Sequence, residues 1–307
     1  MTFKRVALVC LVALVLIAIV TAAPKGRTLT VREINAAIKA QHAAWKAVEN
    51  RFTWMTAAER RLRLGGFPPE ITAGADMVID QAKPGPTLPT SFDWRNQNGY
   101  NWMTPVRDQG NCGSCWAFGT LAALEAKMQI YFSNPNLSPD LSEQFVVSCD
   151  TSNYGCSGGY ADRVYNFIRD TGAPDEACFR YQAEDLPCSD RCGDWASRVH
   201  KIASWSWVCT NKANTTNIKN AVYTNGPLTC HMDVYTDFFS YGSGCYTHVT
   251  GAFEGGHMVC ITGWTADGCW IVKNSWGTSW GEQGYFKIKF GNCRIGTTSG
   301  KFVYAGN

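Results

Sequence analysis

The chain has 307 residues, of which 45% are hydrophobic and 13% aromatic, which is enough to bury a substantial core. It carries 28 basic and 25 acidic residues, with no run of Lys or Arg longer than two. This composition excludes a disordered chain, and the charge pattern gives no indication of binding to nucleic acid or to a membrane surface.

The N-terminus has the layout of a secretory signal peptide. Lys4 and Arg5 precede an apolar run from Val6 to Val20, and small residues follow at 21–23. The alternative is a membrane anchor, but this run is shorter than the roughly 20 residues that a membrane-spanning helix needs. We therefore expect residues 1–23 to be removed and no stable membrane anchor to remain.

The cysteine count also indicates export, because 14 cysteines are typical of an oxidising compartment. Cys10 leaves with the signal peptide, and the 13 that remain are an odd number, so we expect one unpaired thiol. The sequences around Asn136 and Asn214 match the acceptor for N-glycosylation, which agrees with a secretory route.

Residues 24–87 read as a separate prosegment. Thr30 and Glu33 have capping-box spacing, and apolar residues recur at helical intervals from Ile34 through Trp45 to Phe52, which predicts a long amphipathic helix. A second short helix is expected at 57–64, followed by a linker at 67–89 that is rich in Pro and Gly. The linker favours a detachable prosegment over a permanently docked domain.

The rest of the chain, 88–307, predicts an α+β domain. Apolar residues on most faces of 115–132 indicate a buried central helix, and more helix is expected at 142–147 and 161–170. Beyond residue 200, short apolar runs at 258–264, 269–273 and 285–290 are typical of strands. We expect a helical lobe at about 110–200, a β-rich lobe at about 201–300 and a cleft between them.

The strip from Gln109 to Phe118 places Cys115 at the start of the predicted central helix. There the helix dipole and free backbone N–H groups stabilise a thiolate. Gly113 and Ser114 are small and leave room for a peptide to approach. A disulfide is the ordinary fate of a cysteine in a secreted protein, but the odd cysteine count and the surrounding strip favour a free nucleophile.

A thiol nucleophile needs a partner that takes its proton and later protonates the leaving amine, and histidine suits this role near neutral pH. His257 follows two glycines and leads into the apolar run at 258–261. A second elaborate strip contains Asn274 and Trp276 and continues to Tyr285. The other histidines lie in the prosegment or have no motif around them: His42, His200, His231 and His248.

Together these strips resemble the active site of papain-like cysteine peptidases, and the resemblance extends over nearly all of residues 30–307. It implies a two-lobed fold with a helical left lobe and a β-barrel-like right lobe. It also implies that Cys115 is the nucleophile, that His257 moves the proton, and that Asn274 orients the imidazole while Trp276 shields that hydrogen bond. Gln109 and the backbone N–H of Cys115 would bind the oxyanion.

The resemblance is nearer to cathepsin B than to papain, on the prosegment strip Leu64-Gly65-Gly66, the approach to His257 from Tyr241, and the cysteines at 188 and 192. It implies disulfides Cys112–Cys156, Cys149–Cys188 and Cys178–Cys192. The remaining six cysteines would form three bridges, whose connectivity stays open: Cys209, Cys230, Cys245, Cys260, Cys269 and Cys293.

One departure from cathepsin B concerns cleavage. The stretch from Tyr160 to Cys192 is too short for the occluding loop that blocks one end of the cathepsin B cleft. We therefore expect an endopeptidase and not a dipeptidyl carboxypeptidase.

A pocket for the substrate residue two before the scissile bond is carried over by the same resemblance. Thr298 replaces the acidic residue with which cathepsin B accepts arginine, which favours an apolar side chain, although His231 could favour polar or acidic ones. The pocket would be lined by Gly158, Gly159, Tyr160, Ala161, His231, Gly255, Gly256 and Thr298.

The resemblance also implies partners and location. We expect protein or peptide substrates, inhibition by the protein's own prosegment and by cystatin-like inhibitors, a monomer, no metal and no organic cofactor. The secretory route leaves a lysosome or vacuole and the extracellular space open. Two rival functions remain: a catalytically silent cleft-binding protein on the same scaffold, and a disulfide-rich structural protein.

Overall fold

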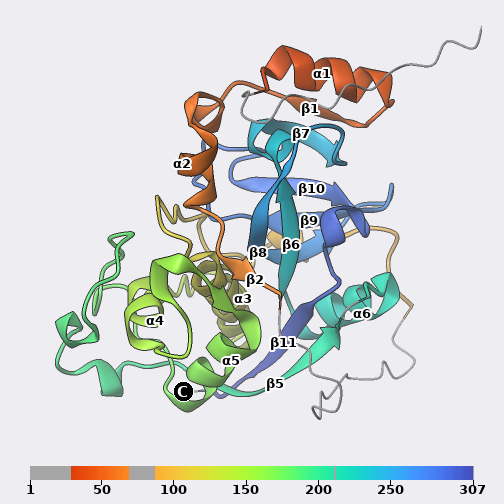
Figure 1. The fold of residues 1–307 in the computed structure, drawn as a ribbon. Helices are drawn as coiled ribbons and strands as arrows, with labels where there is room; N and C mark the ends of the chain where they lie inside the picture. Colours follow the sequence, from red (N-terminus) through yellow and green to blue (C-terminus); the bar gives the residue numbers. More distant parts are fainter. Residues whose placement is uncertain (1–28, 69–86, 211, 307) are drawn as a thin grey trace, which may run out of the picture.

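A computed structural model describes residues 29–68, 87–210 and 212–306 (Figure 1). The predicted signal peptide and most of the predicted linker lie outside these residues. Among the residues described, no helix combines the length and the apolar composition that crossing a bilayer requires.

The predicted capping box begins the first helix, α1 (Val31–Ala40), where the Thr30 and Glu33 side chains each accept a hydrogen bond from the other residue's backbone N–H. The prediction that this helix continues to Phe52 is wrong. Residues Trp45–Ala47 form the strand β1, which pairs antiparallel with β7 (Tyr241–Tyr246). Trp45 packs there against Tyr246, with ring centroids 4.9 Å apart, so tertiary contacts override the helical spacing.

The rest of this N-terminal segment descends along the sheet (Figure 1). A 3₁₀ turn, η1 (Arg51–Trp54), precedes the second predicted helix, α2 (Ala57–Arg61). The segment ends in β2 (Gly66–Phe67), which reaches the helical half of the molecule and pairs in parallel with β4 (Gly159–Tyr160).

Three helices make up the helical half: α3 (Cys115–Tyr131), α4 (Glu143–Cys149) and α5 (Ala161–Asp170). All three were expected from the sequence. In α3, 13 of 17 residues are buried, which confirms it as the central helix. Short 3₁₀ turns occur at η2 (Trp94–Asn96), η3 (Gly155–Ser157), η4 (Cys188–Asp190), η5 (Trp195–Ser197), η6 (Thr236–Ser240) and η7 (Asn292–Arg294).

A nine-stranded sheet forms the other half, with strand order β1-β7-β10-β9-β8-β6-β11-β5 and β3 paired to β8. The order has two free ends, so within the described residues the sheet does not close, which corrects the barrel-like expectation. One further helix, α6 (Thr215–Asn225), was not predicted. The remaining strands are β3 (Phe92–Asp93), β5 (Ile202–Cys209), β6 (Leu228–Tyr235), β8 (Phe253–Trp264), β9 (Cys269–Lys273), β10 (Tyr285–Lys289) and β11 (Ser299–Tyr304).

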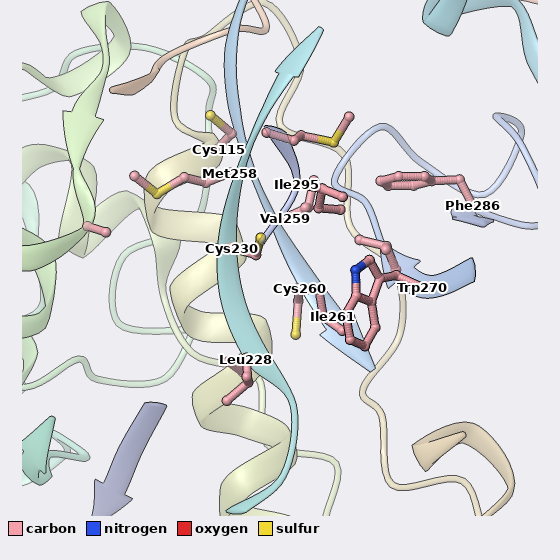
Figure 2. Packing of buried hydrophobic residues seen from close by; sticks show 14 of the residues in the cluster. Cys115, Leu228, Cys230, Met258, Val259, Cys260, Ile261, Trp270, Phe286 and Ile295 are labelled. Atoms are coloured by element: carbon pink, nitrogen blue, oxygen red, sulfur yellow. The ribbon is translucent and has the colours of Figure 1, made fainter. Parts of the chain in front are cut away.

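The two halves meet where α3 packs against β8 and β6. Gly119 allows the close approach, since a Cβ there would lie 3.3 Å from the backbone of Met258. Figure 2 shows Cys115 in this same cluster, with Met258 beside it and Cys230, Cys260 and Leu228 further along the strands. The start of α3 and the middle of β8 are therefore held together by a continuous apolar core.

The structure contains the three disulfides that the resemblance implied, and a fourth joins Cys245 to Cys269. The expectation of one unpaired thiol is wrong for the described residues. Most of the additional unpaired cysteines are buried in the apolar core, where thiols pack as small apolar groups. Burial there raises the pKa of Cys260 to about 12. The unpaired cysteines are Cys115, Cys209, Cys230, Cys260 and Cys293.

Candidate active site

Cys115 is the first residue of α3 and is completely buried. The loop before it is fixed by the disulfide between Cys112 and Cys156 and by a hydrogen bond from the Gly113 N–H to the Cys156 carbonyl, 2.8 Å. Burial raises the pKa of the Cys115 thiol to about 11, although backbone N–H groups, including that of Gly65, act in the opposite direction. The thiol is therefore neutral in this covered state.

His257 and Asn274 meet across the β8–β9 pair. His257 Nε2 lies 2.7 Å from Asn274 Oδ1, and the same oxygen accepts a hydrogen bond from the Ser275 N–H, 2.8 Å. The amide oxygen thus favours the tautomer with hydrogen on Nε2, and Nδ1 has no partner among the described residues. Burial lowers the pKa of His257 to about 4, while the bond to Asn274 acts against that shift.

Trp276 lies over this pair. Its ring centroid is 4.9 Å from that of His257, and it stacks on Phe239 at 5.1 Å with an interplanar angle of 7°. Trp276 is fully buried, and its ring also packs against Phe52 of the N-terminal segment, with ring centroids 5.1 Å apart. The His257–Asn274 hydrogen bond is therefore buried beside the Trp276 ring.

Gln109 is buried and its side-chain amide is held at both ends. Oε1 accepts a hydrogen bond from the Ser275 hydroxyl, 2.6 Å, and Nε2 donates to the carbonyls of Cys112, 2.8 Å, and Arg63, 3.0 Å. The amide donor is thus aimed at a carbonyl oxygen of the N-terminal segment. Neither the Ser275 contact nor the Arg63 carbonyl could be found from the sequence motifs.

Residues 63–67 cover the site, and two glycines make this possible. A Cβ at Gly65 would lie 2.0 Å from the Gly113 carbonyl oxygen, and one at Gly66 would lie 2.7 Å from the backbone of His257. Contacts this short are not tolerated, so only glycine lets the backbone pass between the two halves. Gly65 thereby lies against Gly113, just before α3, and Gly66 of β2 lies against His257 of β8.

Comparison with known proteins identifies the family. The model of the papain family of cysteine proteases matches residues 88–302. The chain belongs to the papain family of cysteine proteases.

Its relatives include both cathepsin B-like and cathepsin L-like proteins. The chain is 35% identical over 278 residues to "Cathepsin B-like CP3" of Giardia intestinalis, covering 87% of this chain and 91% of that one. It is 34% identical over 250 residues to "Cathepsin L-like proteinase" of Fasciola hepatica, covering 78% and 72%.

Solved precursors share the fold. Digestive procathepsin L2 from Tenebrio molitor matches with a TM-score of 0.77 and 28% identity, covering 89% of this chain and 88% of that chain. ProCathepsin B S9 from Trypanosoma congolense matches with a TM-score of 0.78 and 24% identity, covering 91% and 99%. The papain-family chain is thus described in its zymogen form, with the N-terminal segment docked.

Two groups of ion pairs attach the prosegment to the papain-like domain. Arg51 Nη1 lies 2.6 Å from Asp108 Oδ2, and its Nη2 donates to the Trp276 carbonyl, 2.8 Å. Glu254, whose side chain is 3% exposed, lies 2.7 Å from Arg61 and 3.6 Å from Arg60. No sequence motif indicated these contacts, because they join residues far apart in the chain.

The structure brings the predicted pocket residues around β2. Gly66 pairs with Gly159, Phe67 packs on Tyr160 with ring centroids 5.2 Å apart, and a Cβ at Gly158 would lie 2.5 Å from the Phe67 ring. On the other side, Gly256 and Thr298 lie next to His231, whose backbone N–H donates a hydrogen bond to the Thr298 carbonyl, 3.1 Å. The remaining predicted residue, Ala161, directly follows Tyr160 and is buried.

The two predicted glycosylation acceptors lie on the surface. Asn136 is exposed in the turn after α3, and Asn214 is exposed at the start of α6, where its Oδ1 accepts a hydrogen bond from the Asn217 N–H.

Proposed function

We propose that the protein is the precursor of a cysteine endopeptidase that cleaves peptide bonds with Cys115, His257, Asn274 and Gln109. Residues 1–23 would be a signal peptide, 24–87 the inhibitory prosegment and 88–307 the mature enzyme. The protein would act in a lysosome-like compartment or outside the cell, as a monomer that cystatin-like inhibitors can bind. The observation that carries the proposal is the buried His257–Asn274 hydrogen bond of 2.7 Å beside a helix that begins at Cys115.

The geometry supports a definite course of proton transfer. Because Asn274 accepts the Nε2 hydrogen of His257, the free Nδ1 is the atom left to take the proton of the Cys115 thiol. The thiolate then attacks the substrate carbonyl carbon, and the oxyanion accepts hydrogen bonds from Gln109 Nε2 and the Cys115 N–H. His257 returns the proton to the leaving amine, and an acyl-enzyme remains, which a water activated by His257 hydrolyses.

The prosegment would inhibit by occupying these same groups. Gln109 Nε2 is engaged by the Arg63 carbonyl, and Gly65 covers the nucleophile. If the pocket at Tyr160 binds substrate residues before the scissile bond, the prosegment crosses the site in the opposite direction, since Phe67, which follows Arg63 and Gly65 in the chain, lies there. That reversed course would protect it from cleavage. Release would follow a cut between Gly85 and Pro89, made by another peptidase or by the enzyme itself.

Endopeptidase action is supported by the segment between α5 and β5. Two disulfides, Cys149–Cys188 and Cys178–Cys192, tie it to α4 and to itself, and it is too short to carry an occluding loop. Both ends of the cleft would then be open to a long peptide.

The test uses the processed protein and internally quenched peptides in two forms, one blocked at both termini and one with a free C-terminus. An endopeptidase cleaves both at internal bonds, with activity lost in Cys115→Ala. Release of dipeptides from the free C-terminus alone would overturn the endopeptidase assignment. No cleavage of either, together with tight binding of the peptides, would support the catalytically silent alternative.

A further inference from the structure

His231 is a buried side chain whose hydrogen bonding depends on the prosegment. It lies in β6 with 3% exposure, and its Nε2 is 3.2 Å from the Gly66 carbonyl oxygen. Its Nδ1 has no partner among the described residues. The contact with a carbonyl oxygen is attractive only if Nε2 carries the hydrogen, so His231 is a donor aimed at the path of the prosegment.

The acceptor of this hydrogen bond lies where a substrate would bind. Gly66 follows Gly65, which covers Cys115, and it pairs with Gly159 in the β2–β4 ladder. Its carbonyl also lies against Gly256, next to His257, since a Cβ at Gly256 would be 2.1 Å from that oxygen. Once the prosegment leaves, the Nε2–H of His231 loses this partner and faces the substrate.

We propose that His231 selects substrates with a side-chain amide, glutamine or asparagine, two residues before the scissile bond. The inference rests on the proposed peptidase function and names its substrate class. In the zymogen the carbonyl of Gly66 would hold the place that the amide oxygen takes in a substrate. An apolar side chain there would leave the buried donor unpaired, at a cost of about tenfold or more in affinity.

The charged groups around His231 favour a neutral acceptor over a carboxylate. Asp233 lies two residues further along β6 on the same face, and its Oδ1 is 3.6 Å from Arg294 Nη1, so the charge of Arg294 is already paired. In the zymogen, burial, followed by the charge of Arg294, lowers the pKa of His231 to about 4, and the hydrogen bond to the Gly66 carbonyl acts against that shift. A substrate carboxylate would thus lie close to the carboxylate of Asp233, which a neutral amide avoids.

The test compares processed wild-type protein with His231→Leu and His231→Gln on four peptides that differ only two residues before the cleaved bond. Gln, Glu and Met have side chains of similar length and different ends, and Leu is a branched apolar reference. Active enzyme is counted by titrating Cys115 with an epoxide probe, so that misfolded protein does not affect kcat/KM.

We expect wild-type kcat/KM to be about tenfold higher for Gln than for Met or Leu, with Glu below Gln. His231→Leu should reverse that order, and His231→Gln, which keeps a donor, should retain it in part. Preference of the wild type for Met, Leu or Glu, or a Gln-to-Met ratio unchanged in His231→Leu, would overturn the proposal. Absence of both turnover and Cys115 labelling would instead overturn the peptidase function itself.

Discussion

Gln109 has a side-chain amide that is held at both ends. Its Nε2 points at the carbonyl of Arg63, and the Ser275 hydroxyl fixes the other end of the amide. In processed protein, Gln109→Ala should lower kcat by roughly 100- to 1000-fold, because one oxyanion donor is lost. Ser275→Ala, which removes only the support of the amide, should cost less. Peptide cleavage rates measure both, and equal activity of Gln109→Ala and wild type would contradict the assignment.

The ionisation of Cys115 and His257 predicts how the reactivity of the Cys115 thiol in the zymogen depends on pH. In the zymogen burial holds the pKa of the thiol at about 11 and that of the imidazole at about 4, so both are neutral between those values. Alkylation of Cys115 by iodoacetamide should therefore be slow at pH 5 to 9 and accelerate only as the pH approaches the raised thiol pKa. Mass spectrometry of the unprocessed protein against pH measures this, and a fast plateau below pH 8 would contradict it.

The strand β2 fits into the site because it has glycine at position 66, and the proposed inhibition depends on that fit. Gly66→Ala would place a methyl group 2.7 Å from the backbone of His257, which should lift the prosegment from the cleft. We expect unprocessed Gly66→Ala to cleave peptides that unprocessed wild type does not. Gly193→Ala is the control, because a Cβ there meets nothing within 4 Å. Equal latency of Gly66→Ala and wild type would mean that β2 does not seal the site.

The helix α2 is anchored by a buried carboxylate. Glu254 accepts from Arg61 and from the Thr236 hydroxyl, 2.8 Å, and lies near Arg60, whose side chain is 4% exposed. Glu254→Gln leaves the buried guanidinium of Arg60 without its anionic partner, so docking of the prosegment should weaken by roughly 2–5 kcal/mol. The rate of autoactivation measures the loss. Glu49→Gln, at an exposed prosegment residue, should leave the rate unchanged, and identical rates for both variants would contradict the anchor.

Elements with a clear local pattern could be predicted from the sequence, and those set by distant contacts could not. The helix α5 was predicted at 161–170 with its bounds correct, because its apolar residues fall on one face. The strand β1 was missed because its pairing with β7 leaves no signal in the local sequence. The helix α6 was missed because Thr and Asn dominate its sequence, and only Ile218, Ala221 and Val222 of this helix are buried.

The candidate site, too, could be predicted from the sequence only in part. Motif strips located Cys115, His257 and Asn274, the side chains to which we assign the chemistry. The Arg63 carbonyl is a backbone group and leaves no sequence signal. The expectation of a single free thiol failed because three cysteines, at 209, 230 and 260, are buried in the core and serve packing.

On the scale of the whole molecule, the docking of the prosegment should depend on pH through Asp108. Burial raises its pKa, but hydrogen bonds from Arg51 and the Gly110 N–H outweigh burial and hold the pKa below the ordinary 3.8. The ion pair therefore stabilises the docked state above that value and is lost as the pH falls through the lowered pKa. Autoactivation should accelerate in this acidic window.

Arg51→Met removes that ion pair and should flatten the pH dependence. Both side chains are about one-third exposed, so the pair contributes about 0–1 kcal/mol, and autoactivation at pH 5 should rise by at most about fivefold. Arg32→Met, at an exposed residue of α1, is the matched control. An unchanged pH profile in Arg51→Met would assign the acid response to other groups.

Labelling by an epoxide probe at pH 5 to 6, before and after removal of the prosegment, tests whether the docked prosegment covers a reactive Cys115. We expect no label on the zymogen and one label, at Cys115, on the processed protein, which should lose peptide turnover in proportion to the fraction labelled. The buried thiols at 209, 230 and 260 serve as internal controls and should stay unlabelled. Equal labelling of Cys115 in both forms would show that the prosegment does not cover the thiol, and a processed protein that neither labels nor cleaves would contradict Cys115 as the nucleophile.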